Sequence, residues 1–254
     1  MAGHSQFKNI MYRKGAQDSK RAKLFTKATR EIIVAVKEAG SDPAGNARLR
    51  AAISAAREVN MPKDNIERAI KRASGGDDDS QYVACRYEGY GPGGVAVIVD
   101  ALTDNRNRTA ADVRAVFTRY GGNLGETGSV SFQFDRVGEI IYPASAGSAE
   151  TIFEVALEAG AHDVSSTNQE HTITTTFEDL NKVREFLTEK LGEPQHSAPV
   201  WRPNNTIAVS GDQAASLFKM IDALDDSDDV QQVSSNFDVD EETGLRSIRD
   251  IKEQ

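Results

Sequence analysis

Hydrophobic positions early in the chain recur at helical spacing. Within residues 18–39, Phe25, Ile32 and Val36 fall on one arc at about 100° per residue, and lysines and arginines fall on the opposite arc. This pattern predicts an amphipathic helix with one buried face and one cationic face.

Two further helices are predicted after it. Asp42 is a suitable N-cap before a proline, which predicts a helix over 43–59, and a third helix begins near Pro62 and ends before residue 75. Three short helices with short connections are typical of a small bundle. Residues 1–17 show no hydrophobic period, and we expect them to form a flexible arm.

Beyond residue 81 the pattern changes to strands and helices. Strands are predicted at 82–88, 95–102, 129–134, 206–210 and 230–237, and helices at 107–120 and 212–224. The intervening stretch repeats the order βαββαβ, with strands at 139–142, 163–166, 171–176 and 198–201 and helices at 148–159 and 178–191. Pro199 interrupts the last of these strands, which predicts a position at a sheet edge.

Together these patterns predict an α+β multidomain fold. We expect an N-terminal three-helix domain followed by two α/β domains of ferredoxin-like βαββαβ order, one inserted into the other. The expected domains are a basic helical domain with its arm, an α/β domain in two segments, an inserted α/β domain and a C-terminal tail, at residues 1–76, 77–135 plus 204–240, 136–203 and 241–254.

The net charge of the whole chain, -9, hides two opposite halves. Residues 1–76 carry 16 basic and 7 acidic side chains, whereas residues 77–254 carry 14 basic and 32 acidic ones. The first part therefore has a net charge of +9 and the second a net charge of -18. The change occurs at Gly75-Gly76, which precede three aspartates, and this composition is typical of a linker.

Several classes of protein are excluded or disfavoured by composition. Cys85 is the single cysteine, so no intramolecular disulfide or multi-cysteine zinc site can form. The longest apolar run, 95–99, is too short to span a bilayer, and no signal-peptide core follows Met1, so we expect a cytoplasmic protein. A basic N-terminus also allows a transit peptide as a minor alternative.

No catalytic or metal motif emerges, and we expect neither enzymatic activity nor a cofactor. The four histidines lack ligand spacing, and His162 and His171 are expected to be exposed beside a hairpin turn. Residues 89–94 are glycine-rich but lack the Lys-Ser/Thr of a phosphate-binding loop. The acidic run at 225–229 lacks the pattern of a calcium-binding loop, and we expect it to be a solvated turn.

The basic half predicts a nucleic-acid-binding surface. Lysine and arginine side chains displace condensed counterions from phosphates, and a guanidinium matches phosphate geometry. The alternative is an ordinary solvated helical surface. The candidate residues lie on the arm and the helices: Lys8, Arg13, Lys14, Lys20, Arg21, Lys23, Lys27, Arg30, Arg48, Arg50, Lys63 and Arg68.

Two loops of the acidic half are candidates for a second contact surface. One is Gly91-Pro92-Gly93, and the other is the strand-to-helix turn Asn105-Arg106-Asn107-Arg108, which lies beside a helix N-terminus that favours anions. For the second loop the alternative is a capped turn whose arginines pair with nearby acidic side chains.

At these motifs the chain resembles the YebC/PmpR family, which includes mitochondrial translational activators. The resemblance covers nearly the whole chain and rests on the motifs Met1-Ala2-Gly3-His4-Ser5, Leu24-Phe25-Thr26-Lys27, Asn60-Met61-Pro62-Lys63-Asp64-Asn65, Tyr87-Glu88-Gly89-Tyr90-Gly91-Pro92-Gly93-Gly94 and Gly121-Gly122-Asn123-Leu124-Gly125. Phe7 and Tyr12 depart from the tryptophan and histidine that are common in the family, and both keep an aromatic ring.

The resemblance implies a non-enzymatic cytoplasmic regulator of gene expression that binds DNA and regulates transcription. Some members act in translation on the ribosome, so binding to rRNA or the ribosome is the first alternative. A protein-binding adaptor with an acidic body is the second. We expect no membrane contact and no small-molecule substrate.

Overall fold

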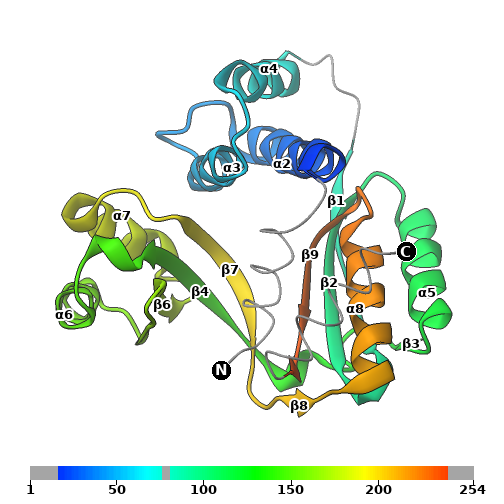
Figure 1. Cartoon of the computed structure of the whole chain (residues 1–254). Helices are drawn as coiled ribbons and strands as arrows, with labels where there is room; N and C mark the ends of the chain where they lie inside the picture. Colours follow the sequence, from blue (N-terminus) through cyan, green and yellow to red (C-terminus); the bar gives the residue numbers. More distant parts are fainter. Residues whose placement is uncertain (1–16, 76–80, 240–254) are drawn as a thin grey trace. The chain divides into compact units, whose positions relative to one another are not determined.

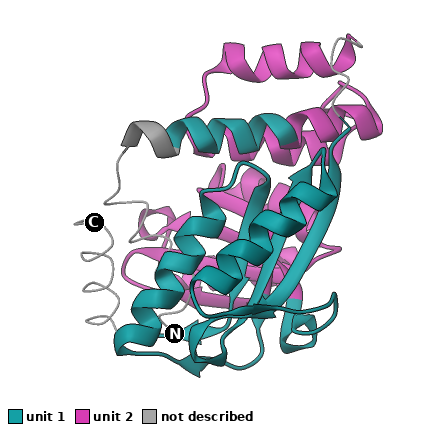
Figure 2. Cartoon of the chain, turned by 90° about the vertical axis from the view of Figure 1, so that its right-hand side faces the viewer, with its two compact units in different colours: residues 1–30, 79–135, 202–254 teal, residues 31–78, 136–201 magenta. Residues whose placement is uncertain are grey.

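The computed structural model describes residues 17–75 and 81–239, with side chains from residue 21 onward (Figure 1). The predicted arm, most of the predicted linker and the C-terminal tail lie outside the described residues. The chain divides into two compact units, one of residues 1–30, 79–135 and 202–254 and one of residues 31–78 and 136–201 (Figure 2). The expected domain boundaries differ from this division and stay a prediction.

The N-terminal helical region is present as predicted. Helices α2, α3 and α4 span Gln17–Ala39, Ala47–Glu58 and Lys63–Ser74. Ile32 and Val36 of α2 are buried, as the helical period requires. Leu49, Ala52 and Ala56 of α3 and Ile66 and Ala69 of α4 are also buried, whereas Ile53 and Ile70 are half-buried. The boundary between the two compact units falls within α2, after Arg30.

The second helix begins later than predicted. Asp42 does not cap it: its carboxylate accepts a hydrogen bond from the amide of Ala44 (2.9 Å) and closes a turn. Asn46 is the N-cap, accepting from the amide of Leu49 at 2.9 Å. The same buried side chain donates to the carbonyl oxygens of Ala35 (2.7 Å) and Gly40 (2.8 Å), which ties the turn to the end of α2. These extra partners explain why Asn46 starts the helix.

The first unit contains a four-stranded antiparallel sheet in the order β3-β1-β2-β9. Its strands span Val83–Tyr90 (β1), Ala96–Thr103 (β2), Asn123–Leu124 (β3) and Val230–Ser235 (β9), and a 3₁₀ turn, η1, spans Pro92–Gly94. Helices α5 (Arg106–Arg119) and α8 (Gly211–Asp225) pack on it through a core that includes Val97, Val99, Phe117 and Leu217.

Two predicted strands of this unit differ from the structure. The first of them was predicted at 129–134, but residues 129–133 form no strand. The amides of Val130 and Ser131 instead donate to the buried carboxylate of Glu88 at 3.0 and 2.8 Å. Burial of Glu88 opposes its ionised form, but these backbone hydrogen bonds outweigh burial and lower its pKa. A 3₁₀ turn, η2, follows at Ser131–Gln133.

The strand predicted at 206–210 is reduced to β8 (Ile207–Ala208), which pairs in parallel with β10 (Phe237–Asp238) in a separate two-stranded sheet. Strands β1 and β2 occupy the two interior positions of the main sheet.

The inserted segment has the predicted βαββαβ order. Strands β4 (Phe134–Pro143), β5 (Asp163–Ser166), β6 (Glu170–Thr176) and β7 (His196–Pro203) form a sheet in the order β5-β6-β4-β7. A 3₁₀ turn, η3 (Ala144–Ala146), follows β4. Helices α6 (Ala149–Ala159) and α7 (Leu180–Leu191) share a core with the sheet through Ile140, Ile152, Ile173 and Leu187. Pro199 lies in the edge strand, where its missing N–H is tolerated.

The α+β fold class, with its N-terminal helices and two main sheets, is confirmed. None of the described helices is both long enough and apolar enough to cross a membrane.

Candidate nucleic-acid interface

The cationic face of α2 contacts the acidic turn at residues 225–229, which connects α8 to β9. The ammonium of Lys27 donates to the backbone oxygen of Asp225 at 2.6 Å, and Lys23 forms an ion pair with Asp226. Arg30 donates to the backbone oxygen of Asp228 at 2.7 Å. All of these residues belong to the first unit. The turn thus supplies oxygen acceptors to the cations that were predicted to bind phosphate.

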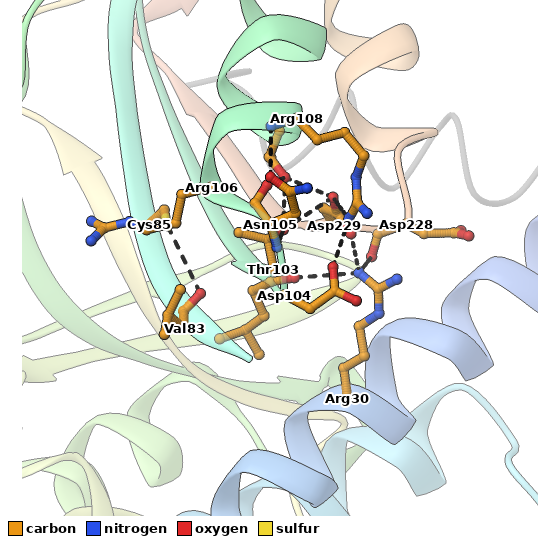
Figure 3. Close-up of polar contacts among 12 residues, drawn as sticks. Arg30, Val83, Cys85, Thr103, Asp104, Asn105, Arg106, Arg108, Asp228 and Asp229 are labelled. Atoms are coloured by element: carbon orange, nitrogen blue, oxygen red, sulfur yellow. Dashed lines mark hydrogen bonds and ion pairs between the residues drawn. The ribbon is translucent and has the colours of Figure 1, made fainter. Parts of the chain in front are cut away.

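Asp229 ends the acidic turn and is buried, with 6% of the residue exposed. Its carboxylate accepts hydrogen bonds from Arg30, from Arg108 (2.9 Å) and from the hydroxyls of Thr109 (2.7 Å) and Thr103 (3.3 Å) (Figure 3). The expectation of a solvated turn was therefore wrong for Asp229. It fits Asp226 and Asp228, which are exposed.

The local fold brings these groups together. Thr103 ends β2, Thr109 lies in the first turns of α5, and the amide of Leu102 donates to the backbone oxygen of Asp229 at 2.8 Å. A register shift in the β2–β9 pairing at Asp100/Ala101 precedes this contact. The carboxylate consequently lies beside the N-terminal part of a helix, where a negative charge is favoured.

Burial of Asp229 opposes its ionised form, but hydrogen bonds from Arg108, Thr109 and Arg30 outweigh burial and lower its pKa to about 2. Arg108 also pairs with Asp104 at 2.8 Å, and the hydrogen bonds to both carboxylates raise the pKa of Arg108. Asp229 and Arg108 are therefore both charged at neutral pH.

The turn before α5 is capped, as the alternative interpretation expected. The side chain of Asn105 accepts from the amide of Arg108 at 3.0 Å, and the amide of Asn105 donates to Thr103 at 2.9 Å. Arg106 and Asn107 are exposed, and the backbone oxygen of Arg106 accepts from Tyr87 at 3.3 Å.

The two candidate loops are not brought together. Gly91, Pro92 and Gly93 precede β2, whereas Asn105 follows it, so the eight-residue strand separates the loops. Gly91 is buried, and a side chain there would meet Met220 and Leu217 of α8 at 2.7 and 3.0 Å. A contact surface shared by both loops is not supported by this arrangement.

Two candidate arginines, Arg48 and Arg50, bind acceptors within the second unit. Arg48 binds Glu31 at 2.8 Å and Glu38 at 2.6 Å. Arg50 donates to the backbone oxygens of Pro43 and Ala44 at 2.7 and 2.9 Å.

In α4, the side chain of Lys63 is 83% exposed and lies 3.5 Å from Glu67. Arg68 is also exposed and donates to the backbone oxygen of Asp64 at 3.2 Å. Arg21 is exposed and lies over the ring of Phe25 at 5.5 Å.

Four candidate cations have side chains outside the described part of the structure. Lys8, Arg13 and Lys14 lie outside the described residues, and so does the side chain of Lys20. Sequence reasoning missed Asp229 as an organising residue, since an aspartate at the end of an acidic run has no distinguishing pattern.

The histidines and acidic residues form no metal site where the structure can be described. Across residues 17–75 and 81–239, no group of three His, Cys, Asp or Glu side chains could hold a metal ion. His171 was expected to be exposed but is buried, with its ring nitrogens 2.8 Å from the Ser166 hydroxyl and 3.0 Å from the Gly147 carbonyl oxygen. Those two contacts indicate a structural role.

Comparison with known proteins agrees with this architecture. Residues 5–76 match a family model described as the TACO1/YebC protein N-terminal domain, and residues 82–237 match one described as the TACO1/YebC second and third domain. The chain is also similar to a solved structure described as a conserved hypothetical protein, Aq1575, from Aquifex aeolicus. The two are 47% identical with a TM-score of 0.80, and the match covers 90% of this chain and 94% of that one. The chain therefore belongs to the TACO1/YebC family, whose second and third domains carry the family name of a transcriptional regulator.

Proposed function

We propose that the protein is a non-enzymatic, nucleic-acid-binding regulator of gene expression that acts in the cytoplasm on DNA. The observation that carries this proposal is the segregation of charge: the helices and arm of residues 1–76 have a net charge of +9, and the rest of the chain has -18. Such segregation directs a polyanion to the helical part and away from the acidic sheets. The family name of a transcriptional regulator supports the assignment to transcription.

Helix α4 carries several exposed cations. Its buried side is formed by Ile66 and Ala69, and the basic residues of its last turn, Lys71 and Arg72, are exposed. Lys63 extends the exposed side toward the N-terminus of the helix. A phosphate that reaches Lys63 would compete with one exposed carboxylate, that of Glu67 at 3.5 Å.

Helix α2 contributes differently. Lys23 and Arg30 are bound to the acidic turn, so a phosphate must replace carboxylate and carbonyl oxygens to reach them. The exposed carboxylates of Asp226 and Asp228 also repel any phosphate that approaches this face. Binding through α2 is therefore in competition with the turn.

This competition favours one second candidate, a structured RNA such as rRNA on the ribosome. A long duplex lying along α2 would meet the exposed acidic side chains of the turn. A folded RNA can contact the exposed cations of α4 without lying along α2. Translational regulation is accordingly the alternative to transcriptional regulation.

The test is a parallel binding measurement on the full chain. Fluorescence anisotropy is recorded with a labelled DNA duplex and with a labelled rRNA hairpin of equal charge, over a range of salt concentrations, and ribosome co-sedimentation is measured beside a DNA footprint. The proposal expects duplex binding whose log–log salt slope is about -5 for about six phosphate contacts. Ribosome association without duplex binding would replace DNA by RNA, and failure to bind either nucleic acid would overturn the proposal.

A further inference from the structure

Helix α6 of the inserted segment exposes two large apolar side chains one turn apart. Phe153 is 53% exposed and Leu157 is 66% exposed, although both lie within a well-formed helix (labelled in Figure 1). Both ends of the helix are capped. The hydroxyl of Ser148 accepts a hydrogen bond from the amide of Thr151 at 3.2 Å, and Gly160 ends the helix with a φ of 86°. The exposure is therefore a property of one helix face and not of a frayed end.

The opposite face of α6 packs into the core of the inserted segment. Ile152, Ala156 and Ala159 are buried in the core that the helix shares with the sheet and α7. Phe153 and Leu157 add nothing to that core, and adjacent exposed apolar side chains are a common feature of protein-binding surfaces.

Glutamates line the same face. Glu150, Glu154 and Glu158 are all exposed, follow one another at i, i+4 spacing, and run beside Phe153 and Leu157. The helix contains no lysine or arginine. Within the described part of the chain none of the three glutamate side chains forms an ion pair or a hydrogen bond. Like charges at this spacing repel one another, and Glu158 also lies near the helix C-terminus, where the helix dipole disfavours it.

We propose that this face of α6 binds a basic amphipathic protein segment. Apolar side chains one turn apart on the partner would cover Phe153 and Leu157, and lysines or arginines beside them would neutralise the glutamates. One partner of this chemistry relieves both unfavourable features of the free helix, since it removes apolar area from water and supplies the missing counter-charges. The face lies in the acidic part of the chain, so the inference is independent of the proposed nucleic-acid function.

The test uses the full chain and a synthetic peptide that forms an amphipathic helix with leucines one turn apart and lysines beside them. Amide chemical-shift changes in the isotope-labelled protein should centre on residues 150–158. Replacing both apolar residues, Phe153→Ser with Leu157→Ser, should weaken peptide binding by about tenfold or more. Replacing the three glutamates by glutamine should weaken binding several-fold and remove most of its salt dependence.

Matched variants control for loss of apolar area and for net charge. Phe132→Ser removes an exposed phenylalanine from another part of the chain, and glutamine at Glu126, Glu178 and Glu189 makes the same charge change elsewhere. Neither should alter peptide binding. Three results would each overturn the proposal: equal binding of a peptide with glutamate in place of lysine, equal loss in the control variants, or a dimer in sedimentation that Phe153→Ser with Leu157→Ser converts to monomer. The last result would assign the face to a second copy of the chain.

Discussion

Arg30 of α2 donates a hydrogen bond to the buried carboxylate of Asp229, a residue 199 positions away in the sequence. The Arg30 side chain is itself largely buried, with 15% of it exposed. Because Arg108 and Thr109 bind the same carboxylate, one aspartate links α2 to the end of β2 and the start of α5. Removing it would leave two positive charges without their shared partner.

The first prediction concerns this link. Asp229→Asn should lower the free energy of unfolding by about 3 kcal/mol, because breaking a buried ion pair leaves charge without compensation. Chemical denaturation of the full chain measures the change. Asp226→Asn is the matched control, since that carboxylate is exposed and its ion pair with Lys23 is worth about 1 kcal/mol or less. Equal effects of the two substitutions would show that Asp229 has no special role.

The second prediction is a pH dependence. The folded-state pKa of Asp229 is about 2, below the usual value of 3.8, so ionised Asp229 contributes stability that is present above about pH 4 and lost as the pH falls through 2. The loss should be about 2 kcal/mol. Other carboxylates titrate in the same range, so the measurement is the difference between the wild type and Asp229→Asn across pH 2–5. A difference that stays constant with pH would contradict the pKa assignment.

The third prediction concerns competition between the acidic turn and phosphate. Asp226→Asn with Asp228→Asn removes two exposed negative charges beside the α2 cations, and nucleic-acid affinity should rise by about threefold to tenfold. Anisotropy with a labelled duplex measures it. Glu126→Gln with Asp135→Asn makes the same change in net charge at other exposed positions, and it should have a smaller effect. If the two pairs act equally, the turn does not compete locally.

The fourth prediction concerns Gly89 in β1. A Cβ atom at this position would lie 2.5 Å from the backbone oxygen of Asn123 and 2.8 Å from the ring of Phe117. Since β3 would have to move away, Gly89→Ala should destabilise the protein by about 2–3 kcal/mol, as overpacking typically does. Gly45→Ala is the control, because its nearest neighbouring atom is 4.0 Å away, and it should change stability by less than about 1 kcal/mol. The unfolding midpoint in denaturant distinguishes them.

Much of the fold follows from local patterns. Hydrophobic periodicity predicted the helical region and the βαββαβ order of the inserted segment, because each element there buries one face of its own. The errors occur where a contact with a residue distant in the sequence determines the local structure. Asn46 begins α3 because it also binds the end of α2, and Glu88 takes the amides that a strand at 129–134 would have used. Neither partner can be identified from the neighbouring sequence.

The candidate interface was less predictable than the fold. The basic composition of α2 was visible in the sequence, and the pairing of Lys23 and Arg30 with the turn at 225–229 was not, since that turn lies about two hundred residues later. Sequence distance also hid the burial of Asp229. A run of like charges predicts solvation on average, and one member of this run lies in the core contact between β2, α5 and β9.

The central claim is that the helical part binds nucleic acid through its cations, and a charge reversal on α4 tests it most directly. Lys71→Glu with Arg72→Glu is compared with Lys182→Glu and Lys190→Glu, which change the net charge equally on the exposed surface of α7. The account predicts that the α4 pair lowers duplex affinity by about tenfold or more and reduces the log–log salt slope by about 2, whereas the α7 pair leaves the salt slope unchanged. Equal losses for the two pairs, or no loss for the α4 pair, would contradict it.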